Sequence, residues 1–140
     1  MAAHHLPDAL AMRHFRTGAA PEAERERVAE DLRAAGRGTQ ALLLYEGRAG
    51  HPSLERERER AVGDGQTFRL LTLKRLGAPV ADADLRAAAE VAAKAGRAME
   101  ARLGYMALGE LDSVRALASQ LPPGLVPPPP PEPPAATDTR

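Results

Sequence analysis

The residues of this 140-residue chain that could most readily bind a metal lie near its N-terminus. His4, His5 and Asp8 offer imidazole and carboxylate groups, which are metal ligands. If Met1 is removed, the chain begins Ala-Ala-His, and a free amine, two amides and an imidazole can bind Cu(II) in a square plane. Many exposed termini have this capacity. We therefore expect no metal or other cofactor with a biological role.

The most conspicuous charge pattern is "ERERER", Glu55–Arg60. On a helix, opposite charges in this pattern meet at i, i+3, as Glu55 and Arg58 do, whereas like charges meet at i, i+4. The net gain is slight, because the two effects nearly cancel. The pattern favours a solvated helix face, and a stripe that binds a partner is the alternative.

Residues typical of enzymes are poorly placed in this chain. The absence of cysteine excludes disulfides, thiolate zinc sites and a cysteine nucleophile. The "GDG" at Gly63–Gly65 lies within helical sequence and does not follow a strand, so it does not match a phosphate-binding loop. No serine lies in a nucleophile elbow, and no pair of carboxylates falls within an apolar pattern. We therefore predict a protein that is not an enzyme.

The overall charge and the lengths of the apolar runs restrict the classes of partner that the chain could bind. Nineteen Lys and Arg residues balance nineteen Asp and Glu residues, which removes the basic surplus that phosphate neutralisation needs. The longest strongly apolar run, "ALLLY" at Ala41–Tyr45, is too short to span a bilayer, and no signal peptide is evident. We expect no nucleic acid or membrane partner and a cytoplasmic location. The preference for Ala and Arg suggests a GC-rich, bacterial genome.

Two stretches of the chain share one pattern of residues. "AGRGTQALLLYE" begins at Ala35 and "AGRAMEARLGYM" begins at Ala95, and the apolar residues before each follow the i, i+3, i+4, i+7 spacing of an amphipathic helix. A glycine after the last apolar residue can end such a helix, so each stretch predicts helix, glycine turn and second helix. At one constant offset, Ala29, Glu30, Ala35, Gly36, Arg37, Ala41, Leu43 and Tyr45 recur as Ala89, Glu90, Ala95, Gly96, Arg97, Ala101, Leu103 and Tyr105.

The remaining pattern predicts about seven helices and no sheet. Thr39, Ser53 and Asp82 are candidate N-caps. The glycines within residues 51–77 leave open whether that segment forms one helix or two. We expect Tyr45 and Tyr105 to be buried between helices. The helical segments are 4–18, 20–36, 38–50, 51–77, 82–96, 97–109 and 110–122.

The two units resemble tetratricopeptide repeats (TPR). Members of that family carry an alanine and, four residues later, an aromatic residue on the second helix, as in Ala41 to Tyr45 and Ala101 to Tyr105. The first helix matches in spacing alone, and the family's tryptophan and closing proline are absent. Ser53 and Ser113 stand where that proline would be. Residues in the places of the family's first-helix motif are Val28, Ala29 and Leu32, and Ala88, Ala89 and Ala92.

This resemblance implies a short right-handed array of antiparallel helical hairpins that acts as an adaptor or scaffold. We predict such an all-α domain over residues 1–121 and a proline-rich, disordered tail over residues 122–140. The family binds proteins or peptides on the surface lined by its first helices. Solvation of an outer face is the competing explanation for the charges there. The positions implied for partner binding are Glu26, Glu30, Arg33, Arg86, Glu90 and Lys94.

Two other functions fit parts of the sequence. A structural subunit without a peptide groove needs only the helical array. A helix-turn-helix DNA-binding regulator would use the small residues and glycine of "AAKAG" at Ala92–Gly96, with Arg97 and Arg102 near the second helix. However, Arg102 falls where that motif buries an apolar residue, and "TQALLLYE" in the first unit carries no arginine. The identity of the partner and the oligomeric state cannot be assigned from these residues.

Overall fold

The computed structural model describes residues 7–17 and 20–136 and is all-helical, which confirms the all-α part of the predicted fold. Within these residues there are eight α-helices, two short 3₁₀ helices and no strand. None of the described helices is long and apolar enough to cross a membrane. The α-helices are α1 (Ala9–Arg16), α2 (Glu22–Ala34), α3 (Gly38–Leu43), α4 (Pro52–Gly63), α5 (Thr67–Arg75), α6 (Asp82–Lys94), α7 (Ala98–Leu108) and α8 (Leu111–Arg115).

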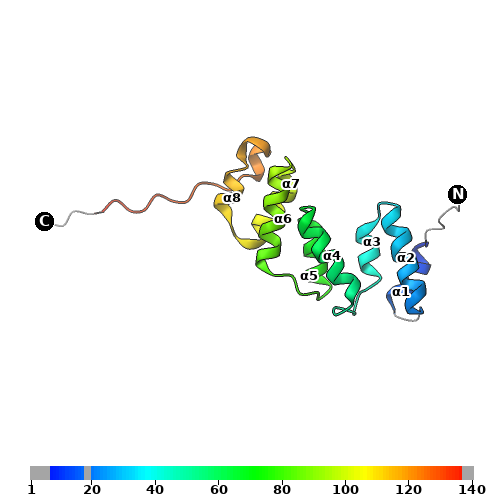
Figure 1. Ribbon diagram of the computed structural model, residues 1–140. Coiled ribbons are helices and arrows are strands. Elements are labelled where there is room, and N and C mark those ends of the chain that lie inside the picture. Colours follow the sequence, from blue (N-terminus) through cyan, green and yellow to red (C-terminus); the bar gives the residue numbers. More distant parts are fainter. Residues whose placement is uncertain (1–6, 18–19, 137–140) are drawn as a thin grey trace.

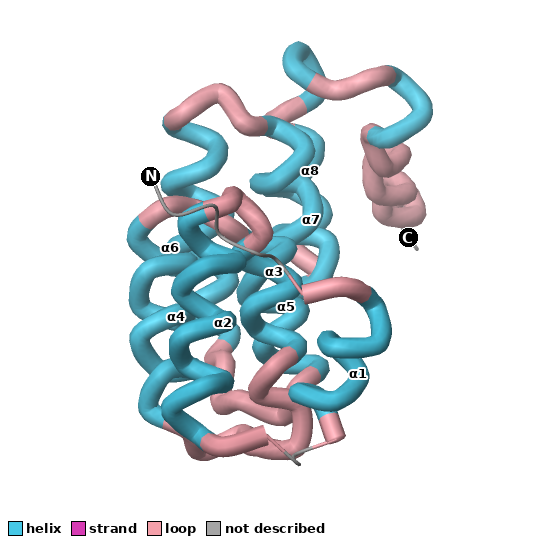
Figure 2. Tube along the Cα trace, turned by 90° about the vertical axis from the view of Figure 1, so that its right-hand side faces the viewer, coloured by secondary structure: helices cyan, strands magenta, loops and turns pink. Residues whose placement is uncertain are grey.

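The helices form two layers. Helices α2, α4 and α6 lie side by side in one layer, and α3, α5 and α7 form the other (Figure 2). We call the first set the first helices and the second set the second helices, because each first helix is followed by a second helix that packs against it. Helix α1 lies at one end of the array and α8 packs against α7 at the other (Figure 1).

Each first helix ends at a glycine in the left-handed region. Gly36, Gly65 and Gly96 have φ of 74°, 67° and 75°. The next residue in each case donates its N–H to a carbonyl five residues earlier, the hydrogen bond of a helix-closing glycine turn. The stops predicted at Gly36 and Gly96 are therefore confirmed. Gly65 supplies a third such turn between them, so the ambiguous segment 51–77 forms two helices, α4 and α5.

The core consists of small and aliphatic side chains around two tyrosines. Tyr45 is 1% exposed and Tyr105 is 8% exposed, which confirms their predicted burial. Ala41 and Ala101, one helical turn earlier, are fully buried. These alanines let the second helices approach the first, and the tyrosine rings fill the space further along.

Two predicted N-caps are wrong. Helix α3 begins at Gly38, directly after the glycine turn, so Thr39 already lies inside the helix. Helix α4 begins at Pro52, whose fixed φ and missing N–H suit the first helical position. The cap therefore falls on His51, whose Nδ1 accepts the N–H of Ser53 at 3.1 Å.

The N-cap predicted for α6 is also wrong. Asp82 is the first residue of the helix, and Ala81 occupies the capping position. The carboxylate of Asp84 reaches back to accept the N–H of Ala81 at 2.9 Å. At the start of α1, Asp8 caps the helix by accepting the N–H of Ala11. The metal-binding capacity considered for His4 and His5 lies outside the described residues.

The last hairpin completes a helix end of the hairpin before it. The Oε2 atom of Glu100, on α7, accepts the N–H of Phe68 at 3.2 Å in the first turn of α5. The hydroxyl of Thr67 lies 2.6 Å from the Glu100 carbonyl oxygen and 2.7 Å from its carboxylate. An acidic group at a helix N-terminus is favourable, so α7 stabilises the start of α5.

Contacts with the helices continue past Leu121, where the tail was predicted to begin. Pro123–Leu125 forms a 3₁₀ turn, and Val126 packs against the C-terminal part of the core. Arg102 Nε donates to the carbonyl of Leu125 at 2.9 Å, and Arg115 Nε donates to that of Pro128 at 3.0 Å. Residues 129–136 are exposed and lead away from the helices (Figure 1). Disorder of the tail stays a prediction.

Gly104 marks a close approach of α7 to its neighbours. A Cβ atom there would lie 2.8 Å from Thr67 Cγ2 and 2.9 Å from Ala89 Cβ. We predict that Gly104→Ala lowers the free energy of unfolding by about 1–3 kcal/mol, because the added methyl group overpacks the contact. Gly63→Ala is the matched control, since its Cβ meets no atom within 4 Å and alanine favours a helix. Urea denaturation measures both, and equal stability of the two variants would contradict the prediction.

Candidate protein-binding surface on the first helices

The outward side of the first helices carries glutamates in register. Glu30, Glu59 and Glu90 each lie six residues before the glycine that ends their helix, and all three are exposed. We call these residues the glutamate row. One turn earlier, Arg27 and Arg56 are exposed at equivalent positions of α2 and α4. The glutamate therefore recurs on all three first helices, and the arginine recurs on two of them.

The predicted partner-binding residues do not share one environment. Glu26, Glu30, Glu90 and Lys94 are exposed on α2 and α6, as the prediction requires. Glu59 was missed because the middle hairpin was not recognised. Its spacing from Gly65, which equals that of Glu30 from Gly36, could have identified it.

Arg33 and Arg86 are both engaged within the chain. The Arg33 side chain is 15% exposed and lies against Glu30 and Glu57, so little of it projects outward. Arg86 Nε donates to Glu110 at 2.7 Å, and this hydrogen bond, together with the charge of Glu110, raises the pKa of Arg86. A partner would have to compete for these two arginines and for Glu30, which pairs with Arg33 at 2.7 Å, whereas the other two glutamates of the row are exposed.

Glu57 corrects the prediction of a uniformly solvated "ERERER" face. Its side chain is 3% exposed, and it occupies the position that Val28 and Ala88 take in the neighbouring first helices. Arg33 Nε lies 2.7 Å from Glu57 Oε1, in an ion pair that is close but not aligned as a hydrogen bond. Arg69 reaches within 4.0 Å from α5. A buried carboxylate needs such partners, because desolvation of an unpaired charge is costly.

Arg25 is a second charge in an apolar position. It is 0% exposed and stands where Leu54 and Leu85 stand in the other first helices. Its guanidinium donates to the carbonyl of Phe15 at 3.2 Å and to the Glu22 carboxylate at 3.0 Å. Arg25 therefore ties α1 to α2. The burial of Arg25 could not be predicted from the sequence, because Arg25 lies in a run of alternating Glu and Arg residues and nothing there distinguishes it from Arg27.

Ion pairs connect the first helices in order along the array. Each pair joins an arginine to a carboxylate of the next helix or of the turn before α8, so the layer is linked from end to end. The pairs are Arg33–Glu57 at 2.7 Å, Arg58–Asp84 at 2.8 Å and Arg86–Glu110.

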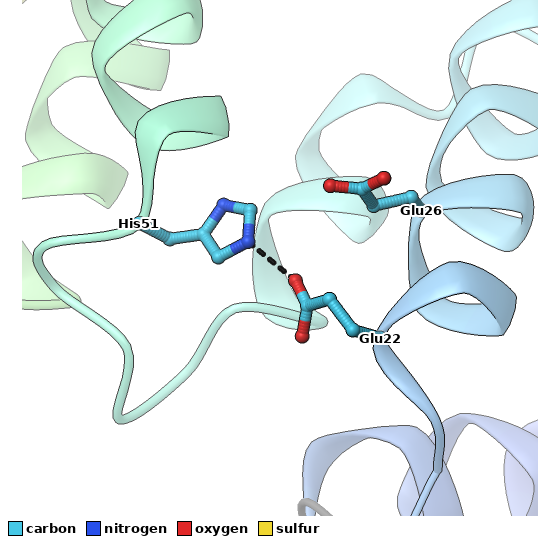
Figure 3. Close-up of side chains that lie close together, drawn as sticks. All are labelled: Glu22, Glu26 and His51. Atoms are coloured by element: carbon cyan, nitrogen blue, oxygen red, sulfur yellow. Dashed lines mark hydrogen bonds and ion pairs between the residues drawn. The ribbon is translucent and has the colours of Figure 1, made fainter.

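Glu22, Glu26 and His51 form the cluster closest to a metal site in the described part of the chain (Figure 3). One ligand atom from each lies within 4.8 Å of the others. His51 and Glu22 face each other from the start of α4 and the first turn of α2 (Figure 3). An imidazole with two carboxylates could in principle hold Zn²⁺.

The hydrogen bonds of this cluster indicate an ion-pair clasp instead. His51 Nδ1 accepts the N–H of Ser53, which places the ring proton on Nε2, where it is donated to Glu22. A metal on Nε2 would require the proton on Nδ1, and the cap of α4 would be lost. Arg48 also donates to Glu22 at 2.6 Å. The cluster therefore fastens α4 to α2.

An open groove of about 610 Å³ lies between α1 and α3. Met12 and Leu43 contribute apolar side chains to it. Arg16 and Glu46, both on its lining, pair with each other at 2.5 Å. The groove has no buried polar group aimed into it, so it offers less chemistry than the surface of the first helices.

The arginines required by a DNA-reading helix are engaged within the chain. Arg97 donates to the carbonyls of Asp64 and Gly65, at 2.5 and 3.4 Å, and closes the end of α4. Arg102 holds the carbonyl of Leu125. Comparison with protein-family models, curated proteins and solved structures finds no match to this chain. Function must therefore be inferred from the geometry.

The Arg33–Glu57 pair predicts an asymmetry between its two partners. Arg33→Met should lower the free energy of unfolding by about 3 kcal/mol, because it leaves a buried carboxylate poorly compensated. Glu57→Met should stay within about 1 kcal/mol of wild type, because the arginines it releases are partly exposed and can turn to water. The double variant should recover most of the loss. Equal losses for both single variants, measured in urea, would refute this asymmetry.

The Glu22 clasp predicts a contribution to stability that depends on pH. Burial raises the pKa of Glu22, but the hydrogen bond from His51 and the positive charges of Arg48 and Arg25 outweigh it, so the pKa lies below 4.5. A lowered folded-state pKa stabilises the protein above the unfolded value of 4.5, and this stabilisation is lost as the pH falls through the folded value. The stability difference between wild type and Glu22→Gln should therefore shrink as the pH falls below 4.5. A difference that is constant with pH would contradict this.

Proposed function

We propose that this chain is a non-enzymatic protein-interaction module, an adaptor or scaffold subunit whose hairpins form a TPR-like array. Its partner binds across the outward side of the first helices. The observation that carries the proposal is the glutamate row, in which Glu30, Glu59 and Glu90 repeat one exposed charge at one position of three adjacent helices.

The spacing of the row suggests the form of the partner. Packed helices lie about 8–10 Å apart, and a polyproline II chain advances about 3.1 Å per residue with three residues per turn. Every third residue of such a segment lies on one side and would therefore meet successive first helices. A segment with Lys or Arg at every third position matches the glutamate row in charge and in spacing.

The buried charges support a receptor of fixed shape. Glu57 and Arg25 lie within the layer, and each is held by partners from another helix. The first helices are therefore held in one register relative to each other, and the glutamate row is presented without rearrangement. A preorganised surface loses little conformational entropy when it binds.

Charge reversal of the row tests the proposal. Wild-type chain should capture a partner protein from an extract of its native cell, identified by mass spectrometry. Glu59→Lys with Glu90→Lys should lose it, because binding energy concentrates in few contacts. Glu24→Lys with Asp82→Lys is the control, since it makes the same charge change at exposed first-turn positions of α2 and α6.

Circular dichroism should show that both double variants stay folded. If the partner is still captured after charge reversal of Glu59 and Glu90, the proposed surface is wrong, although the chain would still be a protein-interaction module. Tight duplex DNA binding in a gel-shift assay, falling steeply with salt, would favour a DNA-binding regulator instead.

A further inference from the structure

Residues 127–134 of the tail take no part in the surface proposed above. We propose that this segment is a preformed polyproline II ligand, held out from the C-terminal end of the array, for a partner with an aromatic-lined proline-binding groove. This second interaction is independent of the glutamate row, and either one could fail without the other.

The sequence restricts the segment to an extended helix. Seven of its eight residues are proline, and the exception is Glu132. Proline fixes φ near the polyproline II value and has no N–H to donate, so neither a helix nor a strand ladder can form. The segment therefore has little conformational freedom to lose on binding.

The three-residue repeat of polyproline II gives the segment three sides. Two of them consist of proline alone, and the third carries Glu132 as the only charge. Either proline side can place two rings one turn apart, which is the spacing that aromatic-lined grooves recognise. The two sides are Pro127, Pro130 and Pro133, and Pro128, Pro131 and Pro134.

The structure anchors the base of the segment and leaves the remainder exposed. Val126 packs against the C-terminal core, and Arg102 and Arg115 hold the carbonyls of Leu125 and Pro128. Residues 128–136 are exposed and extend away from α8 (Figure 1). The proline sides are therefore accessible to a partner without unfolding any helix.

The charge of the segment narrows the partner further. Its backbone carbonyls have no N–H partner within the segment and can accept hydrogen bonds from Trp or Tyr side chains of a groove. Glu132 favours a basic residue beside that groove. The segment has no Lys or Arg, so a groove that requires an arginine beside the prolines does not fit.

Calorimetric titration of the full chain tests this inference. The probes are a purified WW domain and purified profilin, two proteins with aromatic proline-binding grooves. At least one should bind, and Pro130→Ala with Pro131→Ala should weaken it about tenfold or more, because one ring is lost from each side. Pro122→Ala with Pro123→Ala is the matched control outside the segment and should bind as wild type does.

The melting temperature distinguishes a variant that has lost binding from one that has lost its fold. The Pro130/Pro131 variant should melt at the wild-type temperature, because both residues are exposed. Failure of both probes to bind at about 1 mM would overturn the inference. Binding that persists in the Pro130/Pro131 variant, or that is lost equally in the control, would overturn it too. None of these results bears on the glutamate row.

Discussion

Every hairpin of this protein depends on one backbone constraint, a residue that can take a positive φ where a first helix ends. Gly36, Gly65 and Gly96 meet it, and each lets the chain reverse within a few residues so that the second helix packs against the first. Because the three turns close with the same hydrogen bond, positions counted back from each glycine are equivalent. The glutamate row follows from this equivalence, and so does the contrast between the buried Glu57 and its apolar counterparts Val28 and Ala88.

The buried charges fix the position of each helix relative to its neighbours more than they stabilise the fold. Burying Arg25 and Glu57 costs desolvation that apolar residues would avoid, and the leucines and alanines at equivalent positions show that the fold accepts such residues. A displaced helix would leave these charges without partners, whereas an apolar stripe tolerates small shifts. The pairs that join successive first helices therefore favour a single arrangement of the layer, and a surface built from several helices needs such an arrangement to present its charges at fixed spacing.

Sequence periodicity predicted the elements better than their ends or their charged interior. Apolar spacing and glycine stops gave the helices around Gly36 and Gly96, and the matching tyrosines gave two buried positions. The middle hairpin was ambiguous because Gly63 and Gly65 compete as helix breakers, and only the structure shows that Gly65 makes the turn. The caps were misassigned because cap preference is local, whereas the start of α4 is decided by Pro52 and a contact from α2. Glu57 was missed because its partners Arg33 and Arg69 come from other helices.

The contacts that α7 makes with the preceding hairpin impose a direction on assembly. Arg97 closes the end of α4 and Glu100 completes the start of α5, so the middle hairpin borrows both groups from residues that are synthesised later. A nascent chain that has emerged only as far as Arg75 therefore carries a hairpin with two unfinished helix ends. Because domains form as the ribosome releases them, N-terminal parts first, the middle hairpin should remain loosely ordered until Glu100 has emerged. The last hairpin then acts as the closing element of the array during translation.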